Sequence, residues 1–497
     1  MMRRQEPTQS PMFSKSITLS DRVPERHLLR RVKANIDFDF VYHEVEALYG
    51  AVGHPSVPPP IILKLMVVLV LYNVRSEREL MATLPLRLDW LWFLGYDLES
   101  ETPNHSVLSK ARARWGAKLF ETFFQRVLEQ CIQAGLIDGR QVFVDSSLID
   151  ANASIDSLFD KKKATAELRR RLDEQGPTPK GNDSAEQQSE GESKPADEVK
   201  PEAEDQDQGK TARYRSSTDP DATGAKHRGD KMRPRYATHR MIDVSSTVIT
   251  ATAIGPGHQN EAELLVPLIE QHEKRTEAKV ETLTADGKYG VLGNLVACEE
   301  RGIITYVVPF RDNHTTRGGM FAECDFRYDP ESDTYRCPAE QQLKRATYRP
   351  DRDAYKYTAP RQACRVCPLR SHCTTAKRAP RSILRHVKQE LIDRCRKQAR
   401  SDKGRAALKS RMAWMEGSFA SSTRLGYKRA RWRGLDRMRI QDLLIATMQN
   451  CLILLRSLAS LPEKTATRAS FTFVRLRMLV MNMLTPWSVT PTVPAFG

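Results

Sequence analysis

Apolar and polar residues follow two different rhythms along this chain. Over residues 38–138, apolar positions recur at helical spacing, as Phe120 and Phe124 do on one face of a long run. A row of prolines stops the segment before Ile61 and allows a helix to begin there. The pattern predicts an all-α N-terminal domain over residues 38–138, preceded by a flexible basic arm over residues 1–37.

One helix of this domain has the features expected of a DNA contact. Asn104 is placed to cap it, and the helix carries a run of basic residues, Lys110, Arg112 and Arg114. A short helix opened by the capping box of Ser76 precedes it, so the order of elements resembles a helix-turn-helix. A plain helical bundle fits the same pattern equally well, and both interpretations stay open.

From residue 139 the pattern changes to short extended segments. Residues 141–150, QVFVDSSLID, begin with the β-branched and aromatic residues typical of a buried strand. Further strands are predicted at residues 236–244 and 247–254, which are expected to form a hairpin, and at residues 280–290 and 303–310. A helix over residues 261–274 lies among them, and Pro267 is expected to kink it. This order predicts an α/β fold with a mixed sheet, whose first part covers residues 139–310.

Two of these strands end in an acid. Asp145 follows Val144, and Asp286 ends the apolar part of LTAD. A carboxylate at the end of a buried strand must be solvated, paired or bound to a metal. Asp is also common in the turns that end strands, so each acid alone is weak support for a site. Asp150 ends the same segment as Asp145, but its odd offset favours a structural role.

A third acid lies in the helical segment over residues 386–460, which is expected to complete the same domain. An apolar stripe runs along its first part: Leu408, Met412, Met415 and Phe419. Glu416 lies on the edge of this stripe, about 70° from its centre at ~100° per residue. Its carboxylate therefore faces the rim of the core, on the same side as Lys409 and Thr423.

Two insertions interrupt the predicted domain. Residues 174–230 are rich in acids and poor in large apolar residues, so this segment is expected to be disordered. Residues 311–385 contain a cysteine cluster, in YRCP and ACRVCPLRSHC: Cys337, Cys364, Cys367 and Cys373. Thiolates at this spacing suit a structural Zn²⁺, with His372 as an alternative ligand, whereas reduced thiols can also pack as small hydrophobes. Residues 461–497 form a tail.

The charge of the chain indicates a polyanionic partner. The formal net charge is +16, and thirteen Lys and Arg face three acids between Lys377 and Arg411. Clustered basic charge of this kind is the footprint of a nucleic-acid binder. The N-terminus lacks the apolar core of a signal peptide, and the longest apolar run falls short of the ~20 residues of a membrane helix. We therefore expect a soluble cytoplasmic protein with no membrane partner.

Three acids on a basic chain indicate phosphoryl-transfer chemistry. Carboxylate oxygens are the ligands that Mg²⁺ prefers. Two such ions, ~3.5–4 Å apart, can activate an attacking oxygen and stabilise a leaving one. Crowded carboxylates also repel one another, by about 4 kcal/mol at ~4 Å and an effective dielectric of ~20. Asp145, Asp286 and Glu416 are therefore predicted to converge on Mg²⁺.

Several motifs occur in order along the chain: HPSVPPPIILKLMVVLVLYNVRSERELMATL, TPNHSVLSKARARW, FVDSSLIDANAS, LTADGKYG, and RMAWMEGSF followed by RARWRGLDRMRIQDLLIATMQNCLILL. Together they resemble bacterial insertion-sequence transposases of the DDE type, over most of residues 38–460. The resemblance implies a ribonuclease-H-like mixed sheet with flanking helices. The cysteine cluster is similar to an insertion in one branch of the family, here expected to be zinc-ribbon-like. The resemblance also places the catalytic roles on Asp145, Asp286 and Glu416.

A DDE transposase would cleave DNA at the ends of its element and transfer the freed strands to a target, with two Mg²⁺ ions. Its partners would be double-stranded DNA, as terminal inverted repeats and target, and a second copy of the chain in a homodimer. The family's lysine seven residues after the glutamate is replaced by Thr423, so either Lys409, Arg424 or Lys428 stands in for it or the activity is reduced. Arg411 corresponds to an arginine that precedes the glutamate in the family.

Two other functions stay open at this point. A catalytically inactive DNA-binding remnant or repressor would keep the basic surface and lose the reaction. A nuclease of the same fold would cleave DNA without strand transfer. Inverted repeats flanking the gene would distinguish the transposase from both.

Overall fold

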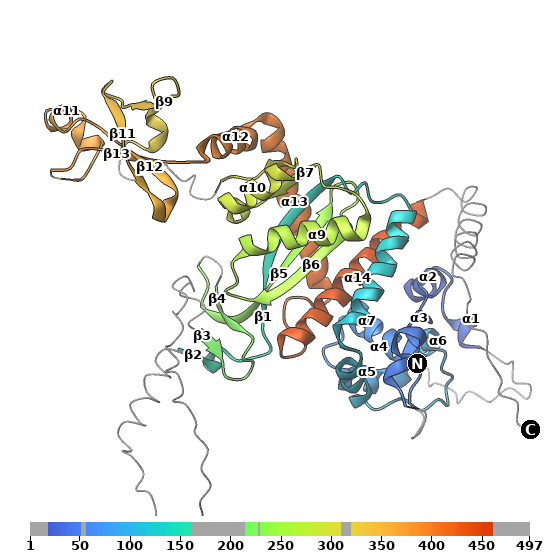
Figure 1. Cartoon of the computed structure of the whole chain (residues 1–497). Helices are drawn as coiled ribbons and strands as arrows, with labels where there is room; N and C mark the ends of the chain where they lie inside the picture. Colours follow the sequence, from blue (N-terminus) through green and yellow to red (C-terminus); the bar gives the residue numbers. More distant parts are fainter. Residues whose placement is uncertain are drawn as a thin grey trace, which may run out of the picture.

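The computed structural model describes residues 18–50, 56–160, 214–226, 229–309, 320–376 and 378–460. Three parts lie in a row in Figure 1, with N-terminal helices at one end, a large mixed sheet between helices in the middle, and a small second sheet at the other end. The mixed α/β class and the helical N-terminal region agree with the sequence prediction. The expected tail at 461–497 lies outside the described residues.

The N-terminal helices begin earlier than the sequence predicts. Their bounds are α1 Leu19–Arg22, α2 Leu28–Asn35, α3 Phe40–Val45, α4 Pro59–Leu71, α5 Glu77–Thr83, α6 Leu88–Leu94 and α7 Ser106–Gln133. The flexible arm predicted over residues 1–37 is wrong for its second half, because Leu29 and Val32 of α2 are fully buried in the core. Ser76 caps α5 as expected, since its Oγ accepts from the Glu79 N–H at 3.1 Å.

Helix α7 joins two helices that the sequence treats as separate. Gly116 lies inside it with a φ of 62°, a left-handed backbone that a glycine adopts without steric cost. The helix is therefore kinked there, and its two halves run in different directions. Beyond the kink, Phe120, Phe123 and Phe124 are buried, which confirms the apolar run.

The central sheet has eight strands in the order β2-β3-β4-β5-β1-β7-β8, with β6 paired to β5. The bounds are β1 Gln141–Asp150, β2 Leu158–Asp160, β3 Tyr214–Ser216, β4 Thr223–Ala225, β5 Arg233–Asp243, β6 Ile249–Pro256, β7 Thr282–Ala285 and β8 Ile304–Tyr306. Strand β1 is antiparallel to β5 and parallel to β7. The hairpin of β5 and β6 confirms the sequence prediction.

The disordered insertion predicted at 174–230 is wrong for its last part. Strands β3 and β4 lie there, and Ser216, Ala222 and Thr223 are almost fully buried. Sequence reading overlooked them because each strand is only three residues long. The acidic stretch before them lies outside the described residues.

Helices cover both faces of the sheet. On one face, α9 Leu265–Thr276 and α10 Leu292–Glu300 share a core with Val142 and Val144 of β1. On the other face, α13 Asp402–Arg424 and α14 Leu435–Ser460 share a core with Phe143 and with the N-terminal helices. Alternate residues of β1 thus serve opposite cores, as the pleat of a strand requires.

Three helical predictions need correction. The helix expected over 261–274 is a 3-10 turn, η4 Glu261–Leu264, followed by α9, and Pro267 falls in the first turn of α9, where it is tolerated without a kink. The long segment after residue 386 divides at Ser401 into α12 Gln389–Arg400 and α13. The third correction concerns Met412, which was expected in the apolar stripe of this segment but is exposed.

Helix α14 is long and apolar enough to cross a membrane by length and composition, as no other described helix is. Two thirds of its apolar window is buried inside the fold. It lies beside α7 and against the central sheet in Figure 1, as the core helix of a globular domain does.

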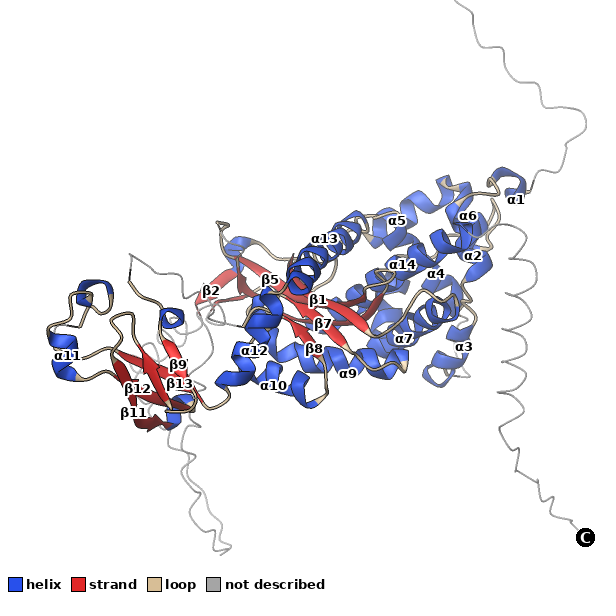
Figure 2. Cartoon of the chain, turned by 90° about the horizontal axis from the view of Figure 1, so that it is seen from above, coloured by secondary structure: helices blue, strands red, loops and turns tan. Residues whose placement is uncertain are grey.

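The second sheet, called the insertion sheet below, has five antiparallel strands in the order β13-β12-β11-β10-β9. The bounds are β9 Arg327–Asp329, β10 Thr334–Arg336, β11 Gln342–Arg349, β12 Ala354–Thr358 and β13 Ser382–His386, with helix α11 Arg361–Arg365 before β13. Figure 2 shows it apart from the N-terminal helices, beyond α10 and α12. Its own small core contains Tyr335, Leu343 and Tyr357.

Candidate active site

Two of the predicted acids lie side by side in the central sheet. The parallel register of β1 and β7 pairs Val144 with Ala285, and the residues that follow this pair are Asp145, within β1, and Asp286, directly after β7. The pairing ends there, because β7 stops while β1 continues to Asp150. The sequence suggested that Asp145 ends its strand. In the structure it lies within β1, at the point where the neighbouring strand β7 ends.

Asp145 is largely buried and bonded on both carboxylate oxygens. Its Oδ2 accepts from the Arg411 guanidinium at 2.6 Å, and its Oδ1 accepts from the Ser146 N–H at 2.8 Å. Burial raises the pKa of this carboxyl; Arg411 and the Ser146 N–H oppose the rise, and the nearby carboxylates of Asp286 and Glu261 add to it. The site thus gathers negative charge that a cation would stabilise.

Asp286 begins the turn that follows β7. Its Oδ1 accepts from the Gly287 N–H at 2.7 Å, and it caps the short 3-10 helix η5, Gly287–Tyr289. One carboxylate oxygen is used in this way, and the side chain is half-buried. The turn holds Asp286 at the edge of the sheet next to Asp145.

The third predicted acid, Glu416, lies on α13, which packs across β1 and β7. Its side chain is exposed, whereas Arg411 and Met415 face the sheet. Five residues along a helix turn the direction by about 140°, so Glu416 and Arg411 point to different sides of α13. Within the described residues, no group of three or more His, Cys, Asp or Glu side chains is arranged to hold a metal. The two aspartates are brought together, and Glu416 is not brought into contact with them.

Sequence reading missed the residues behind this pair. Tyr289 is fully buried, and its hydroxyl lies 3.0 Å from Nδ1 of His239. Burial lowers the pKa of His239 to about 4, and burial raises the pKa of Tyr289 well above its usual range. Glu261 contributes a further carboxylate and pairs with Lys288 at 2.5 Å. Of these residues, only Tyr289 lies in a motif that stands out in the sequence, LTADGKYG.

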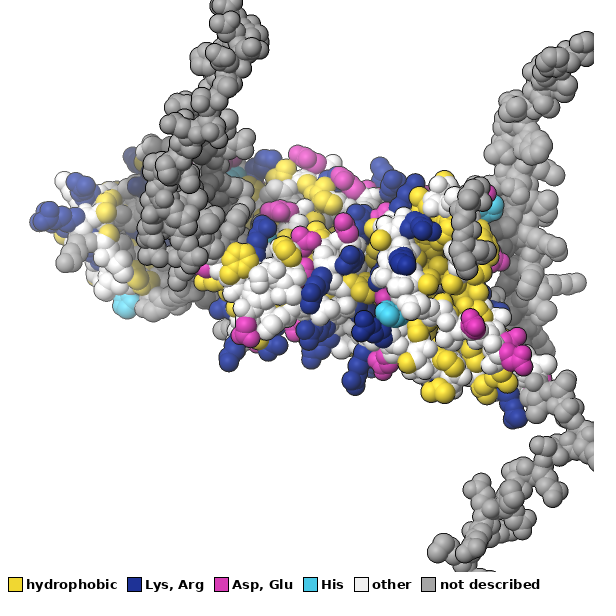
Figure 3. Space-filling view, turned by 90° about the horizontal axis from the view of Figure 1, so that it is seen from below, with side chains coloured by type: hydrophobic (Ala, Val, Ile, Leu, Met, Phe, Trp, Pro, Cys, Tyr) yellow, Lys and Arg dark blue, Asp and Glu magenta, His cyan; other side chains and the backbone are white. Residues whose placement is uncertain are grey.

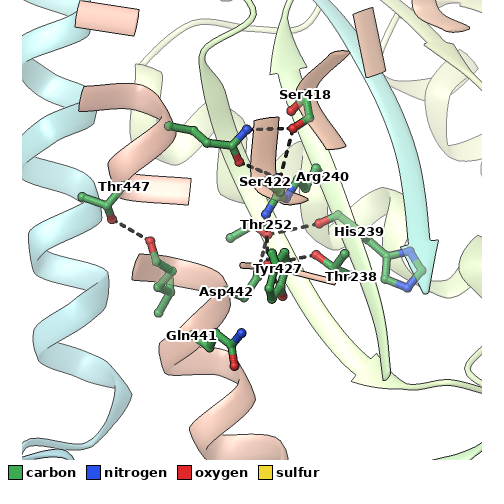
Figure 4. A network of polar contacts seen from close by, with 12 residues as sticks. Thr238, His239, Arg240, Thr252, Ser418, Ser422, Tyr427, Gln441, Asp442 and Thr447 are labelled. Carbon is green, nitrogen blue, oxygen red and sulfur yellow. Dashed lines mark hydrogen bonds and ion pairs between the residues drawn. The ribbon is translucent and has the colours of Figure 1, made fainter. Parts of the chain in front are cut away.

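A buried polar network fixes α13 and α14 on the sheet. Arg240, directly opposite Asp145 in the register of β1 and β5, is fully buried and donates to Gln449 at 2.7 Å and to Ser422. Asp442 lies 3.5 Å from Arg240. Figure 4 shows how these side chains meet between strands and helices.

Asp442 is the acceptor at the centre of this network. Its carboxylate accepts from Tyr427 at 2.6 Å, Thr238 at 2.9 Å and Thr252 at 2.5 Å. Every one of these groups is buried, so the network replaces water with fixed partners. No single residue in it had a sequence signal, because its members come from β5, β6, α13, α14 and the loop after α13.

The predicted DNA-contacting cations divide into exposed and engaged residues. The exposed ones are Lys110, Arg114, Lys409, Arg424 and Lys428. Arg112 was predicted wrongly, because it is buried, pairs with Glu77 and lies 3.9 Å over the Trp432 ring. Arg411 is also engaged, through Asp145. Figure 3 shows Lys and Arg side chains spread across one face of the molecule, interleaved with acidic ones.

The four cysteines of the insertion line one pocket. Cys337 follows β10, Cys364 lies in α11, and Cys367 and Cys373 follow it, and the same pocket wall contains Arg370 and Arg381. Burial raises the pKa of the Cys373 thiol, and the other three cysteines add to this while Arg381 opposes it. The Cys337 Sγ also accepts from the Gln341 N–H at 3.3 Å. All nine cysteines of the chain are free thiols.

Two family models match this chain in separate regions. Residues 17–114 match the family described as Transposase domain (DUF772), which covers the N-terminal helices from just before α1. Residues 336–454 match the family described as Transposase DDE domain, which covers most of the insertion sheet and the helices through most of α14. Glu416 lies inside the second match, and Asp145 and Asp286 lie between the two. No curated protein matches the chain.

Proposed function

This chain belongs to the DDE transposases of insertion sequences, and we propose that Asp145, Asp286 and Glu416 are the three acids of its active site. The observation that carries the proposal is the parallel register of β1 and β7, which puts Asp145 of β1 beside Asp286, the residue directly after β7. Helix α13, which bears Glu416, lies across the same two strands.

The donor set suits Mg²⁺. Asp145 and Asp286 present hard oxygen ligands at one edge of the sheet, and mutual repulsion raises the pKa of Asp145 beyond the effect of burial. Two Mg²⁺ ions, when bound, would supply activation of the attacking oxygen and stabilisation of the leaving one. The protein holds the acids in place: Ser146 and Gly287 orient the two aspartates through their N–H groups, and Arg411 ties Asp145 to α13.

In this proposal the central domain is ribonuclease-H-like. A central strand flanked by one antiparallel and one parallel neighbour, with helices on both faces, agrees with such a core. The domain is assembled from residues 139–310 and 386–460, with the insertion sheet between them. The N-terminal helices share a continuous core with α14, so the proposed DNA-binding domain is firmly joined to the catalytic one.

DNA would be held by cations on both parts of the protein. Lys110 and Arg114 are exposed on the first half of α7, and Lys409, Arg424 and Lys428 are exposed on and after α13. Lys409 comes seven residues before Glu416 on α13, just as Thr423 comes seven residues after it, so Lys409 and Glu416 lie on the same side of the helix. Lys409 is therefore the best substitute for the lysine that Thr423 replaces. Strand exchange needs two element ends in one complex, so we propose a homodimer acting on DNA in the bacterial cytoplasm, at the nucleoid.

The cysteine pocket suits a structural Zn²⁺ in a zinc-ribbon-like insertion. Four thiols from two stretches of the chain line its wall, Cys337 from one and Cys364, Cys367 and Cys373 from the other. Four thiols are the donor set of a Cys₄ zinc site, although among the described residues they are not gathered closely enough to hold a metal already. Cys364→Ser with Cys367→Ser is expected to abolish zinc in protein purified without chelator, whereas Cys324→Ser, an exposed cysteine outside the pocket, keeps it. Zinc-free parent protein would contradict this assignment.

The catalytic proposal is tested with duplex DNA that carries the inverted repeats flanking the gene. The parent is expected to nick and join this DNA with Mg²⁺, whereas Asp145→Asn, Asp286→Asn and Glu416→Gln lose both reactions. Joined products distinguish a transposase from a nuclease that only nicks. Full activity in any of the three variants would contradict the assignment of that acid.

A further inference from the structure

The two faces of the insertion sheet differ in chemistry. One face is aromatic: the rings of Tyr328 and Tyr335 lie 5.1 Å apart, and those of Tyr335 and Tyr357 also lie 5.1 Å apart. Leu343 of β11 is fully buried with them. This face forms the core of the insertion, so the opposite face is turned away from it.

Basic residues cross that opposite face from strand to strand. The residue next to each core-facing residue lies on the other side of a pleated strand, and here these neighbours are Arg327, Arg336, Lys344 and Lys356. They belong to β9, β10, β11 and β12 in turn. Arg327, Arg336 and Lys344 are exposed, and Lys356 is half-buried. We call these four residues the basic sheet face.

The register brings these cations together, with fewer acids than cations among them. Arg336 is directly opposite Arg327, and Lys344 is opposite Thr334, the residue two before Arg336. Like charges directly opposite each other destabilise an antiparallel pair. Arg336 has two acidic neighbours: Glu340 at 3.9 Å, with both side chains more than half exposed, and Asp329, whose carboxyl pKa Arg336 helps to lower. Exposed pairs of this kind attract each other weakly.

Asp329 is the acid at the edge of this face. Its carboxylate accepts from the Ser332 hydroxyl at 2.7 Å and from the Glu331 N–H at 3.2 Å, so it serves the turn between β9 and β10. The wider insertion is basic as well, with fourteen Lys and Arg against eight Asp and Glu over residues 320–386. A polyanion is therefore the partner that would relieve the repulsion.

We propose that the basic sheet face binds the phosphate backbone of double-stranded DNA. Four adjacent strands span ~14 Å at ~4.8 Å per strand, which is about four base pairs at ~3.4 Å per step along one DNA strand. The face has four cations over that length and no aromatic side chain for stacking on bases. It therefore suits the regular phosphates of a duplex more than an unpaired strand.

This inference rests on DNA as the substrate of the proposed function, but not on the three acids. Binding of a fluorescently labelled random-sequence duplex is measured by anisotropy across a salt series, in EDTA, so that a failure of the catalytic assignment leaves the result unchanged. In Arg336→Ala with Lys344→Ala, the slope of log affinity against log salt is expected to fall in magnitude by about 2.

The matched control is Arg361→Ala with Arg365→Ala, which removes the same charge from exposed positions of α11 in the same insertion. It is expected to leave the slope near the parent value. An equal loss in both double variants, or no loss in Arg336→Ala with Lys344→Ala, would overturn the proposal. A loss seen with a single strand but not with the duplex would overturn it too.

Thermal unfolding separates lost contacts from lost structure. Arg327→Ala alone removes one member of the opposed arginine pair, so its melting temperature is expected to equal or exceed that of the parent while duplex binding weakens. Weaker binding with a lower melting temperature in both Arg327→Ala and the double variant would assign these residues to folding and overturn the proposal.

Discussion

The Arg411 guanidinium donates to Oδ2 of Asp145 at 2.6 Å, across 266 residues of sequence. This bond joins α13 to the central strand at the point where β7 departs. Both side chains are largely shielded, with exposed fractions of 12% for Arg411 and 24% for Asp145, so water screens their attraction little. The bond makes Arg411 the residue that positions α13 over the two aspartates.

Arg411→Ala is expected to lower the free energy of unfolding by about 1.5–3 kcal/mol, the usual worth of a charge-assisted hydrogen bond. The remaining carboxylate of Asp145 keeps the Ser146 N–H but loses its cation. Urea unfolding measures the change. Lys409→Ala, an exposed change on the same helix, should stay within ~0.5 kcal/mol of the parent. Equal effects in the two variants would show that the bond contributes nothing to stability.

Asp150→Asn is expected to cost stability and spare catalysis. Asp150 lies on the same strand as Asp145, but its Oδ1 accepts from Arg235 at 2.6 Å, and the Arg235 side chain is nearly buried. The loss should be about 1–3 kcal/mol of unfolding free energy, because Arg235 keeps its second partner, Asp230. Asp145→Asn should show the reverse, with cleavage abolished. Loss of cleavage in folded Asp150→Asn protein would move the metal role to Asp150.

Asp442→Asn is expected to be among the most destabilising single changes in the central domain. It leaves the buried Arg240 guanidinium without its anion, and breaking a buried pair in this way costs about 3–5 kcal/mol. Asp436→Asn, at an exposed position on the same helix, is the matched control. The free energies of unfolding of the two variants, measured with a chemical denaturant, should differ by most of this cost. Near-equal values would contradict the role given to the network.

His239 is expected to weaken the fold in acid. Its pKa is lowered to about 4 by burial, so between its ordinary value of ~6.5 and 4 the unfolded chain takes up a proton that the folded chain excludes. The free energy of unfolding therefore falls as the pH falls through that window, by about 3 kcal/mol for a shift of ~2.5 units. The contribution is fully present above pH ~6.5.

His239→Gln should remove this part of the pH dependence, so that the unfolding free energy of the variant falls less steeply than that of the parent from pH ~6.5 to ~4. His43→Gln, at an exposed position, serves as the control and should keep the parent slope. A parent-like slope in His239→Gln would mean that the ring becomes protonated without unfolding the protein.

The sequence predicts what depends on local pattern. The β5 and β6 hairpin and the cap of Ser76 follow from neighbouring residues, and the structure has both. Asp145 and Asp286 were found for the same reason, because each follows a short apolar run. Their adjacency depends on strand order, which the alternation of strands and helices limits to few arrangements.

The rest depends on contacts between distant segments. Arg112 has the sequence environment of a surface cation, yet Glu77 and Trp432 enclose it. Arg240 gives no signal in its own segment, because its partners come from α13 and α14. The position of Glu416 was inferred from helical angle against a stripe that included Met412, and the exposure of Met412 shows that the stripe is narrower than the pattern indicated.

The central claim is that Asp145, Asp286 and Glu416 act as one metal site. Binding of Mn²⁺, a paramagnetic substitute for Mg²⁺, can be followed by electron paramagnetic resonance in the full chain bound to duplex DNA. Asp145→Asn, Asp286→Asn and Glu416→Gln are each predicted to weaken Mn²⁺ binding at least tenfold, a loss of about 1.4 kcal/mol, whereas Glu270→Gln, on an exposed position of α9, binds as the parent does. Mn²⁺ binding by Glu416→Gln as tight as that of the parent would contradict the claim.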